Sequence, residues 1–275
     1  MSNTANRVKI TKKDKFVSSC IMGGLGNQLF ILFAGYSHAI DNDVDFIVDP
    51  VGGNRRKYYF DTPFYKNLKI NRAKAWTHRE IHHHYDALPA IFPMKIHGYF
   101  QSWKYFDKNK DEIIKRLEFD ELRKEIYNKY EHYQHFDVML HFRIGDYKKN
   151  HPHNHPICDI EYYKAALKNF DEDSKVLYFF EEGDRKEVNG KIEILRGEYP
   201  NMKFTPIDTS IVDYEQMFIM STFKNFIIAN STFSWWGAYL SIKNNKKIVY
   251  PEKWFGPNLS GKKVHDLFMD DWIKV

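Results

Sequence analysis

The sequence predicts an α/β fold of two doubly wound domains, each built around a parallel sheet. Short apolar runs with strand character alternate with longer segments whose apolar residues recur at helical spacing. This alternation occurs twice, and 275 residues are enough for two domains of ordinary size. We therefore expect a flexible lead-in at residues 1–15, a first domain at 16–135 and a second domain at 136–275.

The composition indicates a soluble globular protein and is compatible with a small anionic ligand. Hydrophobic residues make up 43% and charged residues 28%, and the formal net charge is +5. Because basic and acidic residues are interleaved, the charge does not favour a nucleic-acid partner. The two cysteines have neither disulfide nor metal-binding spacing. No apolar stretch approaches the roughly 20 residues of a membrane span. The N-terminus is polar and does not resemble a signal peptide, so we expect a cytoplasmic or cytosolic membrane-peripheral location.

The first domain opens with a strand, a glycine-rich loop, a helix and a second strand, an order typical of a parallel sheet. Residues 52–93 show no clear pattern. The elements expected are a strand at 16–21, a helix from about Gln28, a strand at 44–48, a strand at 95–100 and a helix over about 108–134.

The second domain shows clearer alternation of strands and helices, which predicts a second parallel sheet. Its expected strands are 137–142, 175–180, 202–204, 225–229 and 247–250, and its expected helices are 160–169, 212–223 and 233–242. The crevice between the two domains would hold the ligand.

Three polar loops follow predicted strands, where open α/β sheets bind ligands. The loop at 23–28 is rich in glycine and exposes N–H groups at a helix N-terminus, a setting suited to phosphate. The loop at 141–147 carries Arg143, whose planar cation also suits phosphate. The loop at 230–238 offers hydroxyl donors at the start of another helix.

Each loop also has a simpler interpretation. The first is equally a tight turn that needs small residues. The second is equally a surface ion pair between Arg143 and Asp146. In the third, Asn230 or Ser231 would cap a helix that carries two buried tryptophans.

Taken together, the loops resemble the motifs of the α-1,2-fucosyltransferases, glycosyltransferase family 11. The matching segments are Gly-Gly-Leu-Gly-Asn-Gln-Leu-Phe at 23–30, His-Phe-Arg-Ile-Gly-Asp-Tyr at 141–147 and Ile-Ile-Ala-Asn-Ser-Thr-Phe-Ser-Trp-Trp-Gly-Ala at 227–238. Residues 98–102 and 105–106 also resemble the family pattern. The motifs stand in family order over most of the chain.

The resemblance implies a GT-B-like fold of two Rossmann-like domains and an inverting transfer of fucose from GDP-β-L-fucose, without a metal cofactor, commonly to O2 of a terminal β-galactoside. Arg143 matches the arginine that meets the diphosphate in related enzymes. The residues expected to bind the donor are His141, Gly24, Gly26, Asn27, Gln28, Asn230, Ser231, Thr232 and Ser234.

Further residues have other expected roles. Asp146 is a candidate general base or a brace for its loop. Gln101 and Trp103 are candidates for acceptor binding. Position 144 is Ile, where many relatives carry a second arginine, so a phosphate or loop contact is expected to be missing. Residues 181–184 depart from the family pattern, and a solvated acidic turn is an equal interpretation.

The histidine tracts at 82–84 and 151–155 invite a metal hypothesis, but two prolines prevent a helical ligand face in the second tract, and no metal site is predicted. Alternative functions are transfer with another linkage, transfer from another GDP-sugar, or an inactive glycan-binding protein of the same fold.

Overall fold

The computed structural model describes residues 15–50, 57–150 and 153–275 and divides the chain into two compact units, 1–117 and 118–275. Each unit contains one sheet in which every strand pairing is parallel. The predicted fold class, an α/β chain with two parallel sheets, is therefore confirmed. The predicted lead-in lies outside the described residues apart from Lys15.

The first unit has a four-stranded sheet in the order β2-β1-β4-β3. Its strands are β1 (Phe16–Ile21), β2 (Asp45–Pro50), β3 (Trp76–Arg79) and β4 (Met94–His97), and its α-helices are α1 (Leu25–Asp41) and α2 (Lys110–Arg116). Helix α1 packs closely on the sheet, since a Cβ on Gly35 would lie 2.0 Å from the Ser19 hydroxyl oxygen. The chain moves from β1 to one neighbour, β2, and only later adds β4 on the other side. The order therefore reverses between β1 and β4.

The single helix predicted over 108–134 is divided in the structure. Helix α2 ends at Arg116, Glu118 adopts a left-handed conformation with φ of 55°, and α3 (Phe119–Lys129) follows. Apolar residues at helical spacing continue across this break, which is why the sequence predicts one helix.

The unit boundary lies at 117/118, earlier than the predicted 135/136, because α3 packs on the second unit. The Phe119 and Phe218 rings meet edge to face at 5.2 Å. The buried Arg123 guanidinium donates to the Ser221 hydroxyl at 3.2 Å and to the Leu240 carbonyl at 3.1 Å.

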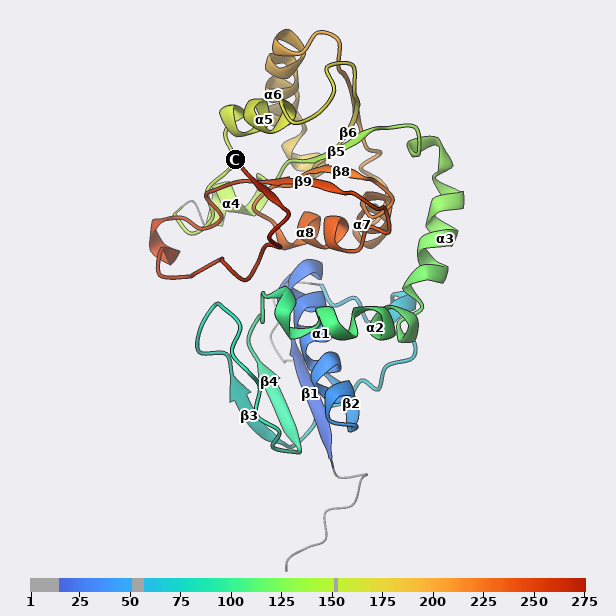
Figure 1. Ribbon diagram of the computed structural model, residues 1–275, viewed down its shortest axis with the longest axis vertical. Helices are drawn as coiled ribbons and strands as arrows, with labels where there is room; N and C mark the ends of the chain where they lie inside the picture. The colour runs from blue at the N-terminus through green and yellow to red at the C-terminus, as the bar shows by residue number, and fades with distance from the viewer. Residues whose placement is uncertain (1–14, 51–56, 151–152) are drawn as a thin grey trace, which may run out of the picture. The chain divides into compact units, whose positions relative to one another are not determined.

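The second unit has a six-stranded sheet in the order β10-β9-β8-β5-β6-β7, with helices on both faces. Figure 1 shows α5 and α6 on one face and α7 and α8 on the other. The strands are β5 (Val138–His141), β6 (Lys175–Phe179), β7 (Lys203–Pro206), β8 (Asn225–Ile227), β9 (Lys247–Tyr250) and β10 (Ile273–Lys274). The helices after α3 are α4 (Gly145–Asn150), α5 (Ile160–Leu167), α6 (Arg185–Glu198), α7 (Asp213–Met220) and α8 (Thr232–Tyr239).

The chain builds this sheet outward from its centre. It starts at β5, adds β6 and β7 on one side, and then crosses to add β8, β9 and β10 on the other. The order therefore reverses between β5 and β8, and such a switch point opens a crevice beyond the carboxyl ends of the strands.

The structure contains elements that the sequence pattern does not predict, namely α4, α6, β3 and β10. Helix α6 includes Gly190 and Gly197, which lower helix propensity, and it is stabilised by burying Val188, Ile192 and Leu195. Among the described residues, no helix is both long enough and apolar enough to cross a membrane.

Candidate active site

The loops after β5, β6 and β8 leave neighbouring parallel strands at the same edge of the second sheet. The switch point lies between β5 and β8. The side chain of His141, the last residue of β5, bridges it: Nδ1 lies 2.9 Å from the Ser234 hydroxyl oxygen of α8. The sequence assigns both residues to one site, and the structure brings them together.

His141 is held as a neutral imidazole. Its side chain is buried, and this burial, together with the nearby Arg143 charge, lowers the pKa of His141 from 6.5 to about 3. Its backbone carbonyl accepts a hydrogen bond from the buried Tyr163 hydroxyl at 3.1 Å. Such a ring stays uncharged at neutral pH and therefore positions its neighbours through hydrogen bonds.

Arg143 lies just beyond the strand and forms ion pairs with two carboxylates, those of Asp146 and Glu181. The guanidinium lies over the Tyr147 ring, 5.1 Å from its centroid. Burial disfavours the charge of Arg143, but the neighbouring Glu181 and Asp146 carboxylates together raise its pKa above the ordinary value. The Asp146 side chain belongs to the same loop as Arg143 and is little exposed, whereas the Glu181 side chain comes from another loop and is 56% exposed.

Residues 181–184, for which the sequence left two interpretations open, take part in this site. The Asp184 carboxylate accepts a hydrogen bond from the Gly145 N–H at 2.8 Å. A Cβ on Gly145 would lie 2.7 Å from a Glu181 carboxylate oxygen, so the loop after β6 lies directly against the Arg143 loop. The sequence analysis did not include Glu181 and Asp184 among the site residues. The acidic cluster directly after the strand predicted at 175–180 could have indicated them.

The third motif supports the Arg143 loop through Asn230. This side chain is 1% exposed, and its amide donates to the Pro156 carbonyl at 2.7 Å and to the Trp254 carbonyl at 3.2 Å. Its backbone carbonyl accepts from the Tyr147 hydroxyl at 3.0 Å. Asn230 therefore holds three segments together around the switch point.

The other polar residues of this motif shape the start of α8. Ser231 is its N-cap, and the hydroxyl accepts from the Phe233 N–H at 3.3 Å. Ser234 is fully buried beside His141, and Thr232 is the first residue of the helix. The α8 N-terminus carries no acidic residue in its first turn, which leaves its positive end suited to an anion.

Ile144, where many relatives carry arginine, is 2% exposed and belongs to the apolar core of the second unit with Phe142 and Tyr163. The side chain points into the sheet–helix interior. The departure at this position thus fills a core site with an apolar side chain.

In the first unit, the loops after β1 and β4 also flank a switch point. Gln101 Nε2, beyond β4, donates to Asn27 Oδ1 in the first turn of α1 at 2.8 Å. Gly23 has φ of +80°, a conformation that favours glycine, and a Cβ there would lie 2.9 Å from the Asn27 side chain. The sequence assigned Asn27 to the donor and Gln101 to the acceptor, and the structure joins them directly.

The remaining residues of the first loop have distinct environments. Gly24 is the N-cap of α1, and a Cβ there would meet nothing within 4 Å. Gly26 is buried in the first turn. Gln28 is also buried, and its amide nitrogen donates to the Gly23 and Lys57 carbonyls, each at 2.8 Å, so it supports the loop.

Glu80, which the sequence analysis did not single out, fixes the loop after β4. Its carboxylate accepts hydrogen bonds from the Tyr99 N–H at 2.7 Å and the Phe100 N–H at 2.9 Å. A Cβ on Gly98 would lie 2.2 Å from the Glu80 Cβ, so glycine is required there. Trp103, a candidate for acceptor binding, is partly exposed just beyond this loop.

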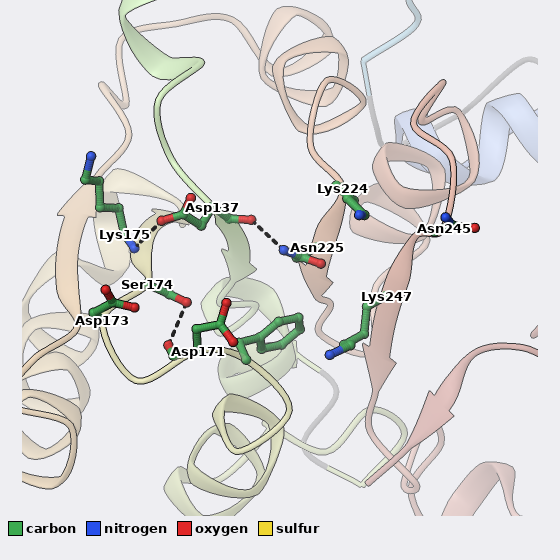
Figure 2. A pocket seen from close by; sticks show the side chains of 10 residues that line it. Asp137, Asp171, Asp173, Ser174, Lys175, Lys224, Asn225, Asn245 and Lys247 are labelled. Carbon is green, nitrogen blue, oxygen red and sulfur yellow. Dashed lines mark hydrogen bonds between the residues drawn. The ribbon is translucent and has the colours of Figure 1, made fainter.

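A pocket of about 560 Å³ lies at the opposite edge of the second sheet (Figure 2). Its lining includes Asp137, just before β5, and the first residues of β6, β8 and β9. Asp137 accepts hydrogen bonds from the Lys175 N–H at 2.8 Å and, through its carbonyl, from the Asn225 amide at 3.0 Å. These groups are engaged with one another at the amino ends of the strands, so the pocket is not the candidate site.

Part of the second histidine tract lies beside the Arg143 loop. The His155 ring stacks on Tyr147 with a centroid distance of 4.7 Å, while His151 lies outside the described residues.

Comparisons with known proteins show which chains this one is similar to. The family model described as Glycosyl transferase family 11 matches residues 57–275. The chain is 27% identical to the O-antigen biosynthesis glycosyltransferase WbnK of Escherichia coli, over 94% of this chain and 99% of that protein. It is 27% identical to an alpha-1,2-colitosyltransferase of Escherichia coli, over 86% of this chain and 91% of that protein.

A solved structure of the fucosyltransferase NodZ from Bradyrhizobium is similar in fold, with a TM-score of 0.50 and 12% identity, over 83% of this chain and 93% of that chain. This likeness bears on the fold alone and agrees with the predicted GT-B-like class.

Proposed function

The chain belongs to glycosyltransferase family 11, and from this premise we propose that it transfers L-fucose from GDP-β-L-fucose to a sugar hydroxyl with inversion at the anomeric carbon. The preferred acceptor in this proposal is O2 of a terminal β-galactoside. The observation that carries the proposal is the placement of Arg143 at the switch-point edge of the second sheet, between two carboxylates and beside neutral His141.

Arg143 has the chemistry that this reaction requires. When the bond between fucose and the diphosphate breaks, negative charge grows on the β-phosphate oxygens. A fixed guanidinium beside them stabilises the transition state more than the ground state. In this mechanism the diphosphate takes the place of Glu181 on the guanidinium, while Asp146 keeps the side chain oriented.

The other donor contacts in the proposal are neutral. The N-terminus of α8, with Thr232 and Ser231, adds N–H and hydroxyl donors for the phosphates. His141, Ser234 and Asn230 hold that end of the helix against β5 and the Tyr147 loop. Together with the Arg143 charge, this set of donors stabilises a diphosphate without a metal ion, and the proposal assigns none.

Asp146 is assigned the role of positioning Arg143 in preference to that of general base, because its carboxylate is already paired with the guanidinium. The Asn27–Gln101 pair and the α1 N-terminus at Gly24 are assigned to substrate binding by the first unit, with Trp103 on the acceptor side. We place the reaction in the cytoplasm or on the cytosolic face of a membrane.

Transfer assays test the proposal directly. The protein is incubated with GDP-fucose and a panel of β-galactosides, with and without a chelator, and both GDP and the glycan product are measured. GDP release with a new α-1,2 linkage supports the proposal. Turnover of no GDP-sugar, despite glycan binding, would instead favour an inactive glycan-binding protein, and loss of turnover on chelation at saturating donor and acceptor would contradict the metal-free mechanism.

A second candidate is transfer of another sugar from its GDP derivative, or transfer with another linkage. The similarity to an alpha-1,2-colitosyltransferase favours including colitose among the donors tested. The same assay distinguishes these candidates by the donor that releases GDP and by the linkage of the product.

The role of Arg143 is tested by Arg143→Ala, for which we expect turnover at least ~100-fold lower, the scale of losing one electrostatic stabiliser. The matched control is Arg196→Ala, since Arg196 lies in the last turn of α6 and donates to the Phe204 carbonyl of β7. Near-normal transfer by a folded Arg143→Ala protein would exclude the assigned role.

The contribution of the first unit is tested by Gly24→Ala. The added methyl group meets no atom within 4 Å, so the unfolding temperature should stay unchanged. If a phosphate approaches the backbone there, the KM for the donor rises severalfold. An unchanged KM would remove Gly24 from the donor site.

A further inference from the structure

Three metal-ligating side chains gather on one loop of the first unit, between β3 and β4. His82 Nδ1 lies 2.9 Å from one carboxylate oxygen of Asp86, and His84 Nε2 lies 3.7 Å from the other. One ligand atom from each residue lies within 4.8 Å of the other two. Among the described residues, it is in this group that three or more histidine, cysteine or carboxylate side chains lie close enough together to hold a metal ion.

These distances suit one small dication. Two ligand atoms on a tetrahedral zinc ion, each bound at about 2.1 Å, are about 3.4 Å apart. The two histidine–carboxylate distances, 2.9 and 3.7 Å, lie on either side of this value. The two imidazole rings stack nearly parallel, with a centroid distance of 4.8 Å, so the rings must turn by a change of side-chain rotamer to aim both lone pairs at one ion.

The backbone of this loop is already fixed by a buried tyrosine. The Tyr105 hydroxyl accepts from the Asp86 N–H at 3.0 Å and donates to the His84 carbonyl at 3.4 Å. Tyr105 is 7% exposed, and the neighbouring Tyr85 ring packs on it with a centroid distance of 4.9 Å. A loop held at two of its three ligand residues loses little conformational entropy when an ion binds.

We propose that His82, His84 and Asp86 bind a transition-metal dication of the Zn²⁺ class. Two imidazoles and one carboxylate favour such ions over Mg²⁺ or Ca²⁺, which prefer oxygen ligands. Three protein ligands leave a coordination position open to water or to another ligand. The His82 and Asp86 side chains are about half exposed, which gives the ion access from solvent.

The site is connected to the candidate substrate-binding residues of the same unit. His83, between the two histidine ligands, has its Nε2 3.1 Å from Gln101 Oε1. Gln101 in turn donates to Asn27 at 2.8 Å. An ion that fixes the loop therefore also restrains the Gln101–Asn27 pair. Through this link, a bound ion would change how tightly the first unit binds its substrate.

Calorimetric titration of the untagged full-length protein with ZnCl₂, after removal of bound metal, tests the site. We expect saturable binding of one ion per chain at this loop, and binding at least ~10-fold weaker in the double variant His82→Ala/His84→Ala. Asp86→Asn keeps the backbone hydrogen bond to Tyr105 and removes only the charged ligand, so it should weaken binding in the same direction. Both cysteines are buried and do not compete for zinc.

The matched control is His132→Ala/His135→Ala, which removes two exposed imidazoles from the other unit. It should bind zinc as the wild type does. Zinc should also slow amide hydrogen exchange over residues 82–86 in the wild type and the control, but not in the His82→Ala/His84→Ala protein. Equal binding by that protein and the wild type, or no saturable binding by the wild type, would overturn the proposal. The titration needs no sugar nucleotide and no turnover, so its failure leaves the proposed transferase activity untouched.

Discussion

Neutral, buried His141 should make the second unit sensitive to acid. Its pKa is about 3 in the folded protein, against 6.5 as the ordinary value. Between pH 3 and pH 6.5, His141 is therefore neutral in the folded protein but protonated in the unfolded chain. The stability associated with neutral His141 is therefore fully present above pH 6.5 and is lost as the pH falls towards 3.

The size of the effect follows from the two pKa values. Uptake of one proton on unfolding gives a slope of about 1.4 kcal/mol per pH unit. Since His141 in the unfolded chain is mostly neutral at pH 7 and mostly charged at pH 4.5, the free energy of unfolding should fall by roughly 2–3 kcal/mol from this residue alone. Carboxylates add their own pH dependence, so the measurement must be a difference between variants.

The variant for this comparison is His141→Asn, because asparagine places a polar atom near the position of Nδ1, opposite the Ser234 hydroxyl, but does not titrate. Urea unfolding at pH 7 and pH 4.5 is followed by the fluorescence of the buried tryptophans, Trp235, Trp236, Trp254 and Trp272, which all belong to the second unit. The pH-dependent loss of stability should shrink by roughly 2–3 kcal/mol in His141→Asn. The control is His132→Asn, at an exposed position.

The reasoning would be refuted by parallel losses in the wild type and His141→Asn. That result would mean that His141 has the same pKa in the folded and unfolded protein, and that the ring is not held neutral beside Arg143.

Two further variants test neighbouring features. Glu181→Gln removes a carboxylate that competes with phosphate for Arg143, so calorimetry should show GDP binding several times tighter, and weaker binding would contradict the displacement mechanism. Gly256→Ala places a Cβ 2.4 Å from the His153 carbonyl oxygen, so the free energy of unfolding should fall by about 1–3 kcal/mol. Gly261→Ala is its control, since a Cβ there meets no atom within 4 Å, and equal stability of the two variants would argue against the close contact.

Much of the secondary structure could be predicted because its signals are local. The strands at 16–21 and 247–250 match the predicted ranges, since continuous apolar runs bounded by polar residues are typical of buried strands. The break at Glu118 and the helix at 185–198 were missed, because both depend on packing that helix propensity does not contain. The unit boundary moved for the same reason: α3 packs on α7, which follows it far along the chain.

The sequence predicted most residues of the candidate site, and the structure changes the roles assigned to some of them. Arg143 stays the residue with the chemistry for a diphosphate, and the structure adds Glu181 and Asp184 as its neighbours from the next strand. Asn230 and Gln28, predicted to contact the donor, have side-chain amides that are engaged by backbone carbonyls. Their burial assigns them to support of the loops.

The sequence by itself determined the α/β class, the order of most strands and helices, and the three polar loops, because strand and helix periodicities and glycine-rich turns are properties of short segments. Only the tertiary structure decided which side chains meet. His141 and Ser234 are 93 residues apart, Asn27 and Gln101 are 74 apart, and Arg143 and Glu181 are 38 apart. Each pair forms because parallel strands align the loops at their carboxyl ends, and strand order, which sets those neighbours, arises from packing of the whole unit.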